Sequence, residues 1–512
     1  MLHTDFFIPL MKQDFLNYIR DTFGFSPSEM TDFENVLRKP LKKTIRINTN
    51  KISVEDFKNH VEKKSAPPFS SGRERIQDRV VEGEYTQERV ALRPASESWT
   101  LTKTPLGKNM FYIDRDDTTI ALGHTLEHIS GYFYVQELAA SSSPYYLSGD
   151  RIDTGDYTIL DMSASPGGKT TQLAEYYPNA TIIANEIDKT RLKQLYENTD
   201  RLGTKNVFVT NYDGRFFANY PEVFDKILLD APCSGEGTAY KTDEALKYWN
   251  IKNIKRIAKL QLQLLESALI SLKVGGELVY STCTLNRLEN EEIVEKVIKK
   301  YGESIEILSP DSQESGLGLR SWPHQTGTGG FFVAKLRKVC SLPENGKKGK
   351  KLQKHTQGFE KISNTDEKEI QRFLSEHFSL KLSGRYYSYR NEAYYTEKNI
   401  DFIWENFFLY KCGIKIGKFE NGEFTPNYYL GTHFGKFEKN SLKFSETDAS
   451  RLLRGESIIA PYPPIPTFPL KGERSQLQEG YYQISQNNIL AGLIKVKNGQ
   501  MESILDTKFM RK

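Results

Sequence analysis

The feature that most constrains the fold is an alternation of short apolar runs with longer amphipathic segments between residues 155 and 338. The apolar runs are rich in Ile, Val, Leu and aromatic residues, and the segments between them repeat apolar residues at helical spacing. Such an alternation indicates a parallel sheet wound with helices. The runs read YTILDM, TIIANE, NVFVTN, FDKILLD, GELVYST and GGFFVAKLRK, and the segments include KTTQLAEYY, KTRLKQLYENTDRLG and NIKRIAKLQLQLLESALISLK.

The pattern divides the chain into regions around this core at 151–340. Residues 1–150 mix helical and alternating patterns, and we expect an α+β amino-terminal domain that binds RNA. The Pro-, Ser-, Arg- and Glu-rich stretch 65–108 predicts an exposed insertion. Residues 341–365 contain NGKKGKKLQK and predict a basic linker. Residues 366–512 carry aromatic, strand-like runs and predict a separate β-rich region.

Composition narrows the classes of function. The net charge is only +4, so any nucleic-acid surface must be local. We find no window of about 18 apolar residues, and no basic start followed by an apolar core, so we expect neither a membrane span nor a signal peptide. Four cysteines suggest reduced thiols in the cytoplasm. The eight histidines lack metal-ligand spacing, so we expect no metal site.

A glycine-rich turn, DMSASPGGKT, follows the first run at residues 161–170. A strand that ends in such a turn and opens a helix lets a ligand approach the backbone. Ser163 stands where a triphosphate-binding loop needs Gly, and the dinucleotide pattern is absent. Glu186, Asp213 and Asp230 follow the next three runs, so they should lie at the same sheet edge. This combination suggests a nucleoside-bearing cofactor without a phosphate chain.

Two of the cysteines also follow apolar runs. Cys233 lies in DAPCSGEGT and Cys283 in YSTCTL. A thiol at the ligand edge suits a nucleophile, whereas free cysteines elsewhere are often small buried apolar residues. We interpret Cys340 and Cys412, which lie in no motif, in the second way. The residues alone do not decide whether Cys233 or Cys283 is the nucleophile.

With these motifs the chain resembles the S-adenosylmethionine-dependent RNA cytosine-carbon-5 methyltransferases of the Nop/Sun type, and most of all the bacterial 16S ribosomal-RNA members with a carboxyl-terminal RNA-binding extension. The resemblance is carried by DMSASPGGKT, ANEID, TNYDGR, LLDAPCSGEGT and YSTCTLNRLENE, and by KTIRINTNK, GYFYVQELAAS and RSWPHQTGTGGFFVAKL. It implies a Rossmann-like class I methyltransferase domain with a mixed, mostly parallel seven-stranded sheet, and a PUA-like RNA-binding module in residues 366–512.

The resemblance further implies a site for S-adenosyl-L-methionine. Glu186 would hold its ribose, Asp213 its adenine side, and Asp230 would border the methyl donor. The turn would enclose its methionine part with Ser163, Ala164, Ser165, Pro166, Gly167, Gly168 and Lys169.

Catalytic roles also come from the resemblance. Cys283 would add to carbon 6 of cytosine, which makes carbon 5 nucleophilic, and Cys233 would help to release the product. Asp230 would hold the charge that develops at ring nitrogen 3, and Lys169 would favour the thiolate. The resulting prediction is a cytoplasmic, monomeric enzyme that makes 5-methylcytosine in RNA, with 16S ribosomal RNA as its substrate.

Several alternatives stay open at this point. The substrate could be transfer RNA, or the chain could be a non-catalytic RNA-binding ribosome assembly factor, although its intact motifs argue against decay. Arg46 and Asn48 could contact RNA or form a salt bridge within their strand. Gln136 and Glu137 could line the target-base pocket or brace a loop.

Overall fold

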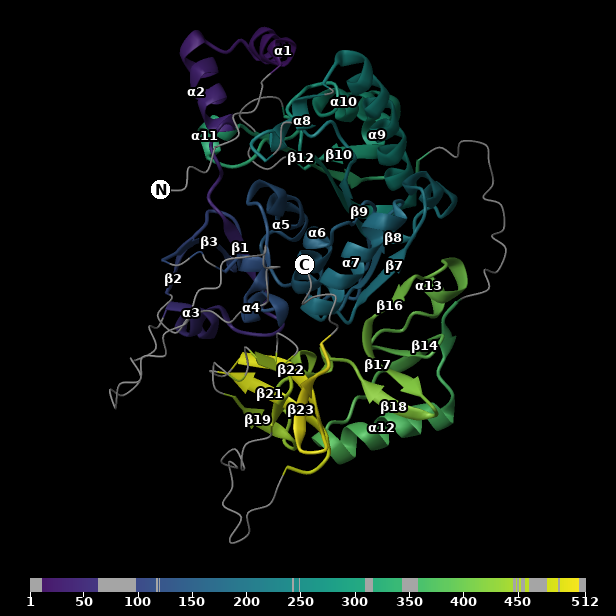
Figure 1. Ribbon diagram of the computed structural model, residues 1–512. Coiled ribbons are helices and arrows are strands. Elements are labelled where there is room, and N and C mark those ends of the chain that lie inside the picture. Colours follow the sequence, from purple (N-terminus) through teal and green to yellow (C-terminus); the bar gives the residue numbers. More distant parts are fainter. Residues whose placement is uncertain are drawn as a thin grey trace, which may run out of the picture.

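A nine-stranded sheet lies at the centre of the part of the chain that the computed structural model describes (Figure 1). That part comprises residues 12–62, 98–116, 118, 120–241, 244–247, 249–308, 316–342, 358–444, 448, 451–452, 456–459, 477–486 and 489–505. The strand order is β10-β12-β9-β8-β5-β6-β7-β16, and β11 pairs with β12. The strands are β5 (Thr158–Asp161), β6 (Thr181–Asn185), β7 (Val207–Thr210), β8 (Phe224–Asp230), β9 (Leu272–Thr282), β10 (Ile305–Ile307), β11 (Leu319–Ser321), β12 (Phe331–Lys338) and β16 (Lys411–Cys412).

Strands β5 to β9 pair in parallel, and the other four pair antiparallel with their neighbours. Each of the six quoted apolar runs forms one of these strands. The path from β10 to β7 contains seven strands, and the short strands β11 and β16 bring the number to nine. The predicted α/β, Rossmann-like class with a mixed, mostly parallel sheet is therefore confirmed.

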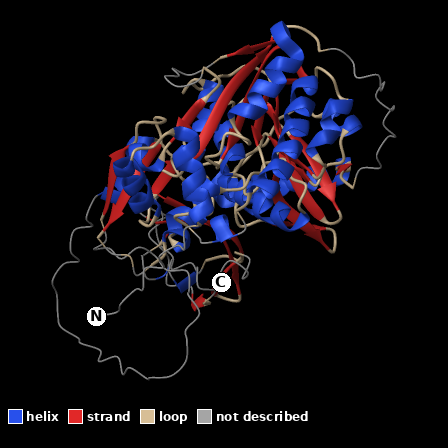
Figure 2. Cartoon of the chain, turned by 90° about the horizontal axis from the view of Figure 1, so that it is seen from above, coloured by secondary structure: helices blue, strands red, loops and turns tan. Residues whose placement is uncertain are grey.

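Helices cover both faces of this sheet (Figure 2). Neighbouring residues of a strand point to opposite faces, so Leu160 packs in one core with α9 and α10, whereas Ile159 packs in another with α5, α6 and α7. Strands buried on both sides explain why the apolar runs are nearly continuous. The helices are α5 (Ser142–Ser148), α6 (Gly168–Tyr176), α7 (Lys189–Leu202), α9 (Ile251–Ser271) and α10 (Glu291–Tyr301).

The amino-terminal domain holds a four-stranded antiparallel sheet in the order β2-β3-β1-β4. Part of the predicted exposed insertion at 65–108 was wrong, because residues 99–103 form strand β2 of this sheet and Trp99 is fully buried. Residues 63–97 of that stretch lie outside the described residues. The elements are α1 (Gln13–Phe23), α2 (Pro27–Leu37), β1 (Thr44–Ile47), α3 (Val54–Glu62), β2 (Trp99–Lys103), β3 (Met110–Arg115), α4 (Leu126–Ile129) and β4 (Phe133–Val135).

The carboxyl-terminal region contains two five-stranded sheets, in the orders β13-β14-β15-β17-β18 and β19-β21-β22-β23-β20. Residues 343–357 of the predicted linker lie outside the described residues. The elements are β13 (Glu360–Lys361), α12 (Asn364–Phe378), β14 (Arg385–Tyr389), β15 (Glu392–Thr396), α13 (Asp401–Asn406), β17 (Ile414–Glu420), β18 (Glu423–Pro426), α14 (Leu430–His433), β19 (Ser441–Lys443), β20 (Ile458–Ile459), β21 (Gly480–Gln486), β22 (Ile489–Lys497) and β23 (Gln500–Ser503).

This region is joined to the rest of the molecule through shared cores. Strand β16 extends the central sheet by pairing with β7. Ile494 of β22 belongs to the same hydrophobic cluster as Ile45 of β1, and the backbone N–H of Leu490 donates to the hydroxyl of Tyr132 at 2.8 Å. The last sheet therefore packs on the amino-terminal domain rather than standing apart from it.

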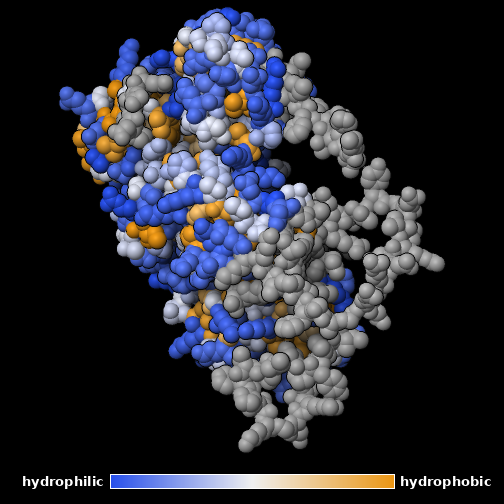
Figure 3. All heavy atoms as spheres, turned by 90° about the vertical axis from the view of Figure 1, so that its left-hand side faces the viewer, coloured by the Kyte–Doolittle hydropathy of each residue, from blue (hydrophilic) through white to orange (hydrophobic). Residues whose placement is uncertain are grey.

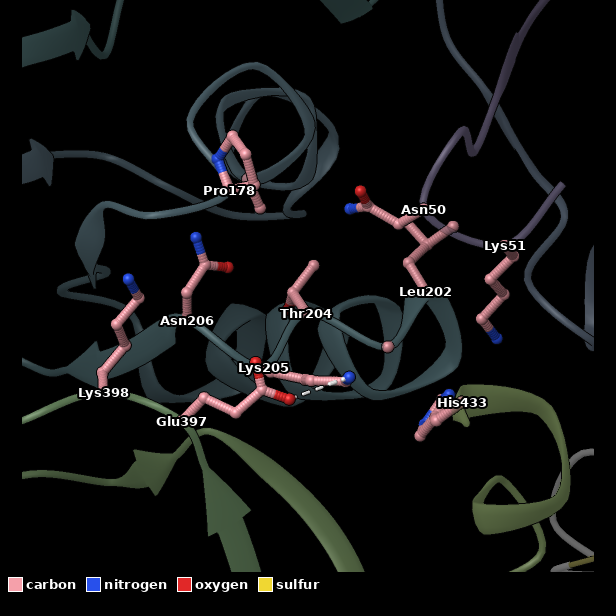
Figure 4. A pocket seen from close by; sticks show the side chains of 12 residues that line it. Asn50, Lys51, Pro178, Leu202, Thr204, Lys205, Asn206, Glu397, Lys398 and His433 are labelled. Carbon is pink, nitrogen blue, oxygen red and sulfur yellow. Dashed lines mark hydrogen bonds and ion pairs between the residues drawn. The ribbon is translucent and has the colours of Figure 1, made fainter. Parts of the chain in front are cut away.

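A cavity of about 210 Å³ lies where the three regions meet (Figure 4). Lys51 comes from the amino-terminal domain, Lys205 from the loop before β7, and His433 from the end of α14. The ammonium of Lys51 donates to the carbonyls of Ser130 and Arg201 and to Oγ1 of Thr432, at 2.7, 2.9 and 3.0 Å. Lys51 thus ties all three regions together by its hydrogen bonds.

The outer surface is polar where it can be seen. The face drawn in Figure 3 is largely hydrophilic, with hydrophobic residues scattered among charged ones. No described helix combines the length and the apolar character that crossing a membrane requires.

Candidate active site

The predicted turn residues Ser163 to Lys169 lie in the connection from β5 into the start of α6. Gly167 has a φ of 104°, in the left-handed region that favours glycine. A Cβ on Gly168 would lie 2.8 Å from the ring of Tyr134, so a side chain has no room there. The two glycines therefore let the turn take its left-handed step and pack closely against Leu195 and Tyr134 at the carboxyl edge of the sheet.

Asp161, the last residue of β5, is a site residue that the sequence reasoning passed over. Its Oδ2 accepts a 2.6 Å hydrogen bond from Thr170, and its Oδ1 is buried without a hydrogen-bond partner among the described residues. Burial raises the pKa of Asp161 to about 7. Asp161 is the first residue of the motif DMSASPGGKT, and this position could have indicated its place in the site. An unsatisfied buried oxygen beside the turn suits a polar group of a ligand.

Arg46 supports the turn from behind and is fully buried. Its guanidinium donates to the carbonyl of Gly168 at 3.3 Å, to Oγ1 of Thr171 at 2.7 Å, to Oε1 of Glu175 at 2.5 Å and to Oε1 of Gln136 at 2.9 Å. Of the two alternatives for Arg46, these contacts favour the ion pair over RNA contact, although the partner lies in α6 rather than in its own strand. Gln136 braces this arrangement as well, because its Oε1 accepts the hydrogen bond from Arg46.

Asn48 and Glu137 also brace loops. Asn48 is buried and donates to the carbonyls of Gly131 and Leu202, both at 2.9 Å. Glu137 accepts from the backbone N–H groups of Ala140 at 2.9 Å and Gly329 at 3.0 Å. These bonds join the amino-terminal domain to the sheet with the glycine turn.

Of the three predicted acids, Glu186 and Asp213 follow β6 and β7, and Asp230 is the last residue of β8, all at the edge where β5 leads into the turn. Glu186 is only 2% exposed, and its Oε2 has no hydrogen-bond partner among the described residues, although Nη1 of Arg191 lies 3.5 Å away. Asp213 pairs with Arg215, whose hydrogen bonds lower the pKa of that carboxyl. The buried Oε2 of Glu186, which has an ion-pair partner but no hydrogen bond within the described residues, fits a cofactor that offers ribose hydroxyls.

Asp230 is held as an ion pair at the end of β8. Its Oδ2 accepts from Nζ of Lys169 and its Oδ1 from Oγ of Ser281, at 2.8 and 2.9 Å. Lys169 comes from the glycine turn and Ser281 from β9. The pair thus connects the turn to the two strands that carry the cysteines.

Cys233 and Cys283 lie with their sulfur atoms 3.3 Å apart, both half-buried. A hydrogen bond joins the two thiols, and either sulfur can be its donor. This bond and the positive charges of Lys169 and Lys241 lower the pKa of Cys283, against burial and the charge of Asp230, which raise it. For Cys233, that same hydrogen bond and its burial raise the pKa. The charges around the pair therefore favour a thiolate on Cys283 and a thiol on Cys233.

Glu236 and Glu289 lock the two cysteine loops together, and both are fully buried. Glu236 accepts from the backbone N–H groups of Leu285 and Asn286 at 2.9 and 3.0 Å. Glu289 accepts from the N–H of Ser234 at 3.0 Å. Both acids stand in the quoted motifs, but their partners come from the other loop, and no local pattern indicates that.

The other two cysteines lie away from this site. Cys340 is exposed. Cys412 is buried in the core of the central sheet, where burial raises its pKa. No group of His, Cys, Asp and Glu within the described ranges is arranged to hold a metal ion.

The chain is similar to known proteins in both sequence and structure. Residues 152–337 match the family model described as 16S rRNA methyltransferase RsmB/F. Ribosomal RNA small subunit methyltransferase F of Vibrio cholerae is 32% identical over 84% of this chain and 86% of its own length. The protein of the same name from Shewanella sediminis is 37% identical over 72% of each chain. The crystal structure of PH0851 is 28% identical, covers 64% of this chain and 66% of its own, and superposes with a TM-score of 0.52.

Proposed function

Since the chain belongs to the RsmB/F family of S-adenosylmethionine-dependent 16S ribosomal RNA methyltransferases, we propose that it methylates carbon 5 of a cytosine in 16S ribosomal RNA through a covalent cysteine adduct. The observation that carries the cytosine-5 chemistry is the pair of thiols 3.3 Å apart beside the Asp230–Lys169 ion pair. Carbon 5 of cytosine is a weak nucleophile, and addition of a thiolate at carbon 6 makes it reactive.

The cofactor, when bound at the glycine turn, supplies an electrophilic methyl group. The turn from Ser163 to Lys169 and the carboxylates of Glu186 and Asp213 would hold it. Oε2 of Glu186 and Oδ1 of Asp161 accept no hydrogen bond from any residue that the structure describes, so both can accept one from a ligand. No metal is needed for any of these contacts.

Cys283 is the nucleophile in this mechanism. Its thiolate adds to carbon 6 and pushes the electrons of the 5,6 double bond toward ring nitrogen 3. Asp230 relays a proton to that nitrogen from the ammonium of Lys169, which leaves carbon 5 as the nucleophilic end of an enamine. After carbon 5 has gained the methyl group, nitrogen 3 returns its proton to the Asp230–Lys169 pair and a water molecule takes the proton of carbon 5. The electrons of that carbon–hydrogen bond restore the 5,6 double bond and expel Cys283 as a thiolate. The thiol of Cys233, which lies next to the sulfur of Cys283, stabilises the leaving thiolate by a hydrogen bond. One sulfur thus forms the adduct, and the other resolves it.

The test is transfer of labelled methyl from S-adenosylmethionine to RNA by the purified full chain, followed by nucleoside analysis. We expect 5-methylcytidine in 16S ribosomal RNA and none in transfer RNA. Labelled 5-methylcytidine in transfer RNA alone would show that transfer RNA is the substrate and that the proposed reaction is right. Cofactor binding without any methylated nucleoside would leave a non-catalytic RNA-binding role.

We also propose that the enzyme acts as a monomer in the cytoplasm and that its carboxyl-terminal sheets include a PUA-like RNA-binding module. The resemblance of the chain and its aromatic, lysine-containing strands support this proposal. Light scattering on the purified chain would measure the mass directly.

A further inference from the structure

A groove of about 480 Å³ runs beside Cys233, between the cysteine loop and helix α9. Pro232 and Cys233 form one side, and Arg256, Lys259 and Leu260 of α9 form the other. The helix is fixed to the loop, because Nε2 of Gln261 donates to the carbonyl of Pro232 at 2.9 Å and to Oε2 of Glu289 at 2.8 Å. The groove therefore keeps a set position relative to the thiol.

The amino-terminal part of α9 carries positive charges and no negative ones. Its first fifteen residues contain Lys252, Lys255, Arg256 and Lys259, and the first acid of the helix is Glu266. Arg256 and Lys259 are exposed and form no ion pair or hydrogen bond with any residue that the structure describes. Arg215 also lines the groove, but it is engaged by Asp213 at 2.5 Å. The cationic side chains of Arg256 and Lys259 thus line the groove beside the sulfur of Cys233.

The cofactor does not account for these cations. S-adenosylmethionine carries no phosphate, and its proposed partners are the glycine turn, Glu186 and Asp213. The RNA strand does carry phosphates, and a target cytosine must leave its stack to reach a thiol. The flanking nucleotides then pass the mouth of the site. Arginine and lysine are the usual partners of such phosphates.

We propose that this groove binds a nucleotide next to the target cytosine, with Arg256 and Lys259 on its phosphates and with Pro232 and Leu260 against its sugar or base. The inference rests on the proposed function, since it takes the thiol at the end of the groove as part of the methylation site. It adds an RNA subsite that orients the strand within the catalytic domain itself.

The test compares Arg256→Ala, Lys259→Ala and their double variant with Lys252→Ala and Lys255→Ala, which remove the same charge from the same helix outside the groove. Binding of a fluorescent 16S ribosomal RNA transcript is measured against salt concentration, and S-adenosylmethionine affinity is measured by calorimetry. We expect the double variant to bind RNA about tenfold more weakly at low salt. Each groove substitution should flatten the slope of log K against log salt by about 0.7. Cofactor affinity should stay within about twofold of that of the unchanged protein.

Equal losses in the groove and control variants would overturn the proposal, because the effect would then be general charge. A loss of cofactor affinity alone would show that the groove binds the cofactor. Unchanged RNA binding in the groove variants would also refute the proposal. Circular dichroism of each variant checks that α9 remains folded. These binding measurements do not depend on methyl transfer, so a failure of the proposed function would show separately as absent 5-methylcytidine in the unchanged protein.

Discussion

Cys233 and Cys283 stand 50 residues apart in the chain, yet their sulfur atoms lie 3.3 Å apart. The reason is the pairing of β8 with β9, where Asp230 lies opposite Ser281 in a parallel register. Cys233 lies three residues after the end of β8 and Cys283 directly after the end of β9, so both emerge at the same edge. The glutamates behind them, Glu236 and Glu289, then hold the two loops in place.

The two thiols should fail in different ways. Cys283→Ala removes the atom that adds to carbon 6, so turnover should fall by several orders of magnitude and no covalent complex should form. Cys233→Ala leaves addition intact but slows release, so protein bound covalently to RNA should accumulate as a slow band on a denaturing gel. Trapping by Cys283→Ala but not by Cys233→Ala would reverse the two roles.

Alkylation should distinguish the thiols without any substrate. The pKa of Cys283 is lowered and that of Cys233 is raised, and the thiolate is the form that reacts. Iodoacetamide near neutral pH should therefore label Cys283 first, as peptide mapping by mass spectrometry would show. In Lys169→Met the labelling of Cys283 should slow and shift to higher pH. Faster labelling of Cys233 would contradict the assigned charges.

Cofactor affinity should depend on Glu186. Charge-assisted hydrogen bonds to ribose hydroxyls contribute roughly 1.5–3 kcal/mol, so Glu186→Ala should weaken S-adenosylmethionine binding by about tenfold or more. Calorimetric titration measures this directly. Glu197→Ala, which removes a half-buried carboxylate paired with Lys193 on α7, is the matched control and should bind normally. Unchanged affinity in a folded Glu186→Ala protein would remove this residue from the site.

The central sheet and its ligand edge could be predicted because each strand carries its own apolar run and its own terminal motif. Parallel pairing then places Glu186, Asp213 and Asp230 together without any further information. Long-range contacts had no such signal. Arg46 and Glu175 are 129 residues apart, and their pairing depends on how the amino-terminal domain packs behind α6.

Local composition failed to predict two strands, β2 and β16. The stretch 65–108 is rich in residues typical of loops, yet Trp99 at its end is buried in strand β2. Lys411–Cys412 is too short to show a period, yet it extends the central sheet as β16. Strand β16 pairs with the distant strand β7, and Trp99 of β2 packs against Phe57 and Phe133, so tertiary contacts outweigh local propensity in both.

Arg46 should act on stability and cofactor binding rather than on RNA affinity. Arg46→Ala would leave Glu175 buried without its charge partner, which costs roughly 3–5 kcal/mol, and would release the carbonyl of Gly168. Urea unfolding should show the loss, and Arg46→Met combined with Glu175→Met should restore part of it. A variant as stable as the unchanged protein that loses RNA affinity alone would instead place Arg46 on the RNA path.

The junction of the three regions should weaken in acid because of His433. Burial and the positive charges of Lys51, Lys411 and Lys205 hold its pKa well below the ordinary value, so the folded protein keeps the imidazole neutral. The unfolded chain takes up a proton below about pH 6.5, so stability is lost as the pH falls, by roughly 1.4 kcal/mol per pH unit. The melting temperature should therefore drop between pH 7 and 5.5, and His433→Gln should make that drop smaller.

His128 should add to this acid sensitivity, since burial and the charge of Arg201 lower its pKa as well. Combining His128→Gln with His433→Gln should make the drop in melting temperature smaller still. A pH profile that neither substitution changes would show that these imidazoles do not control the acid sensitivity.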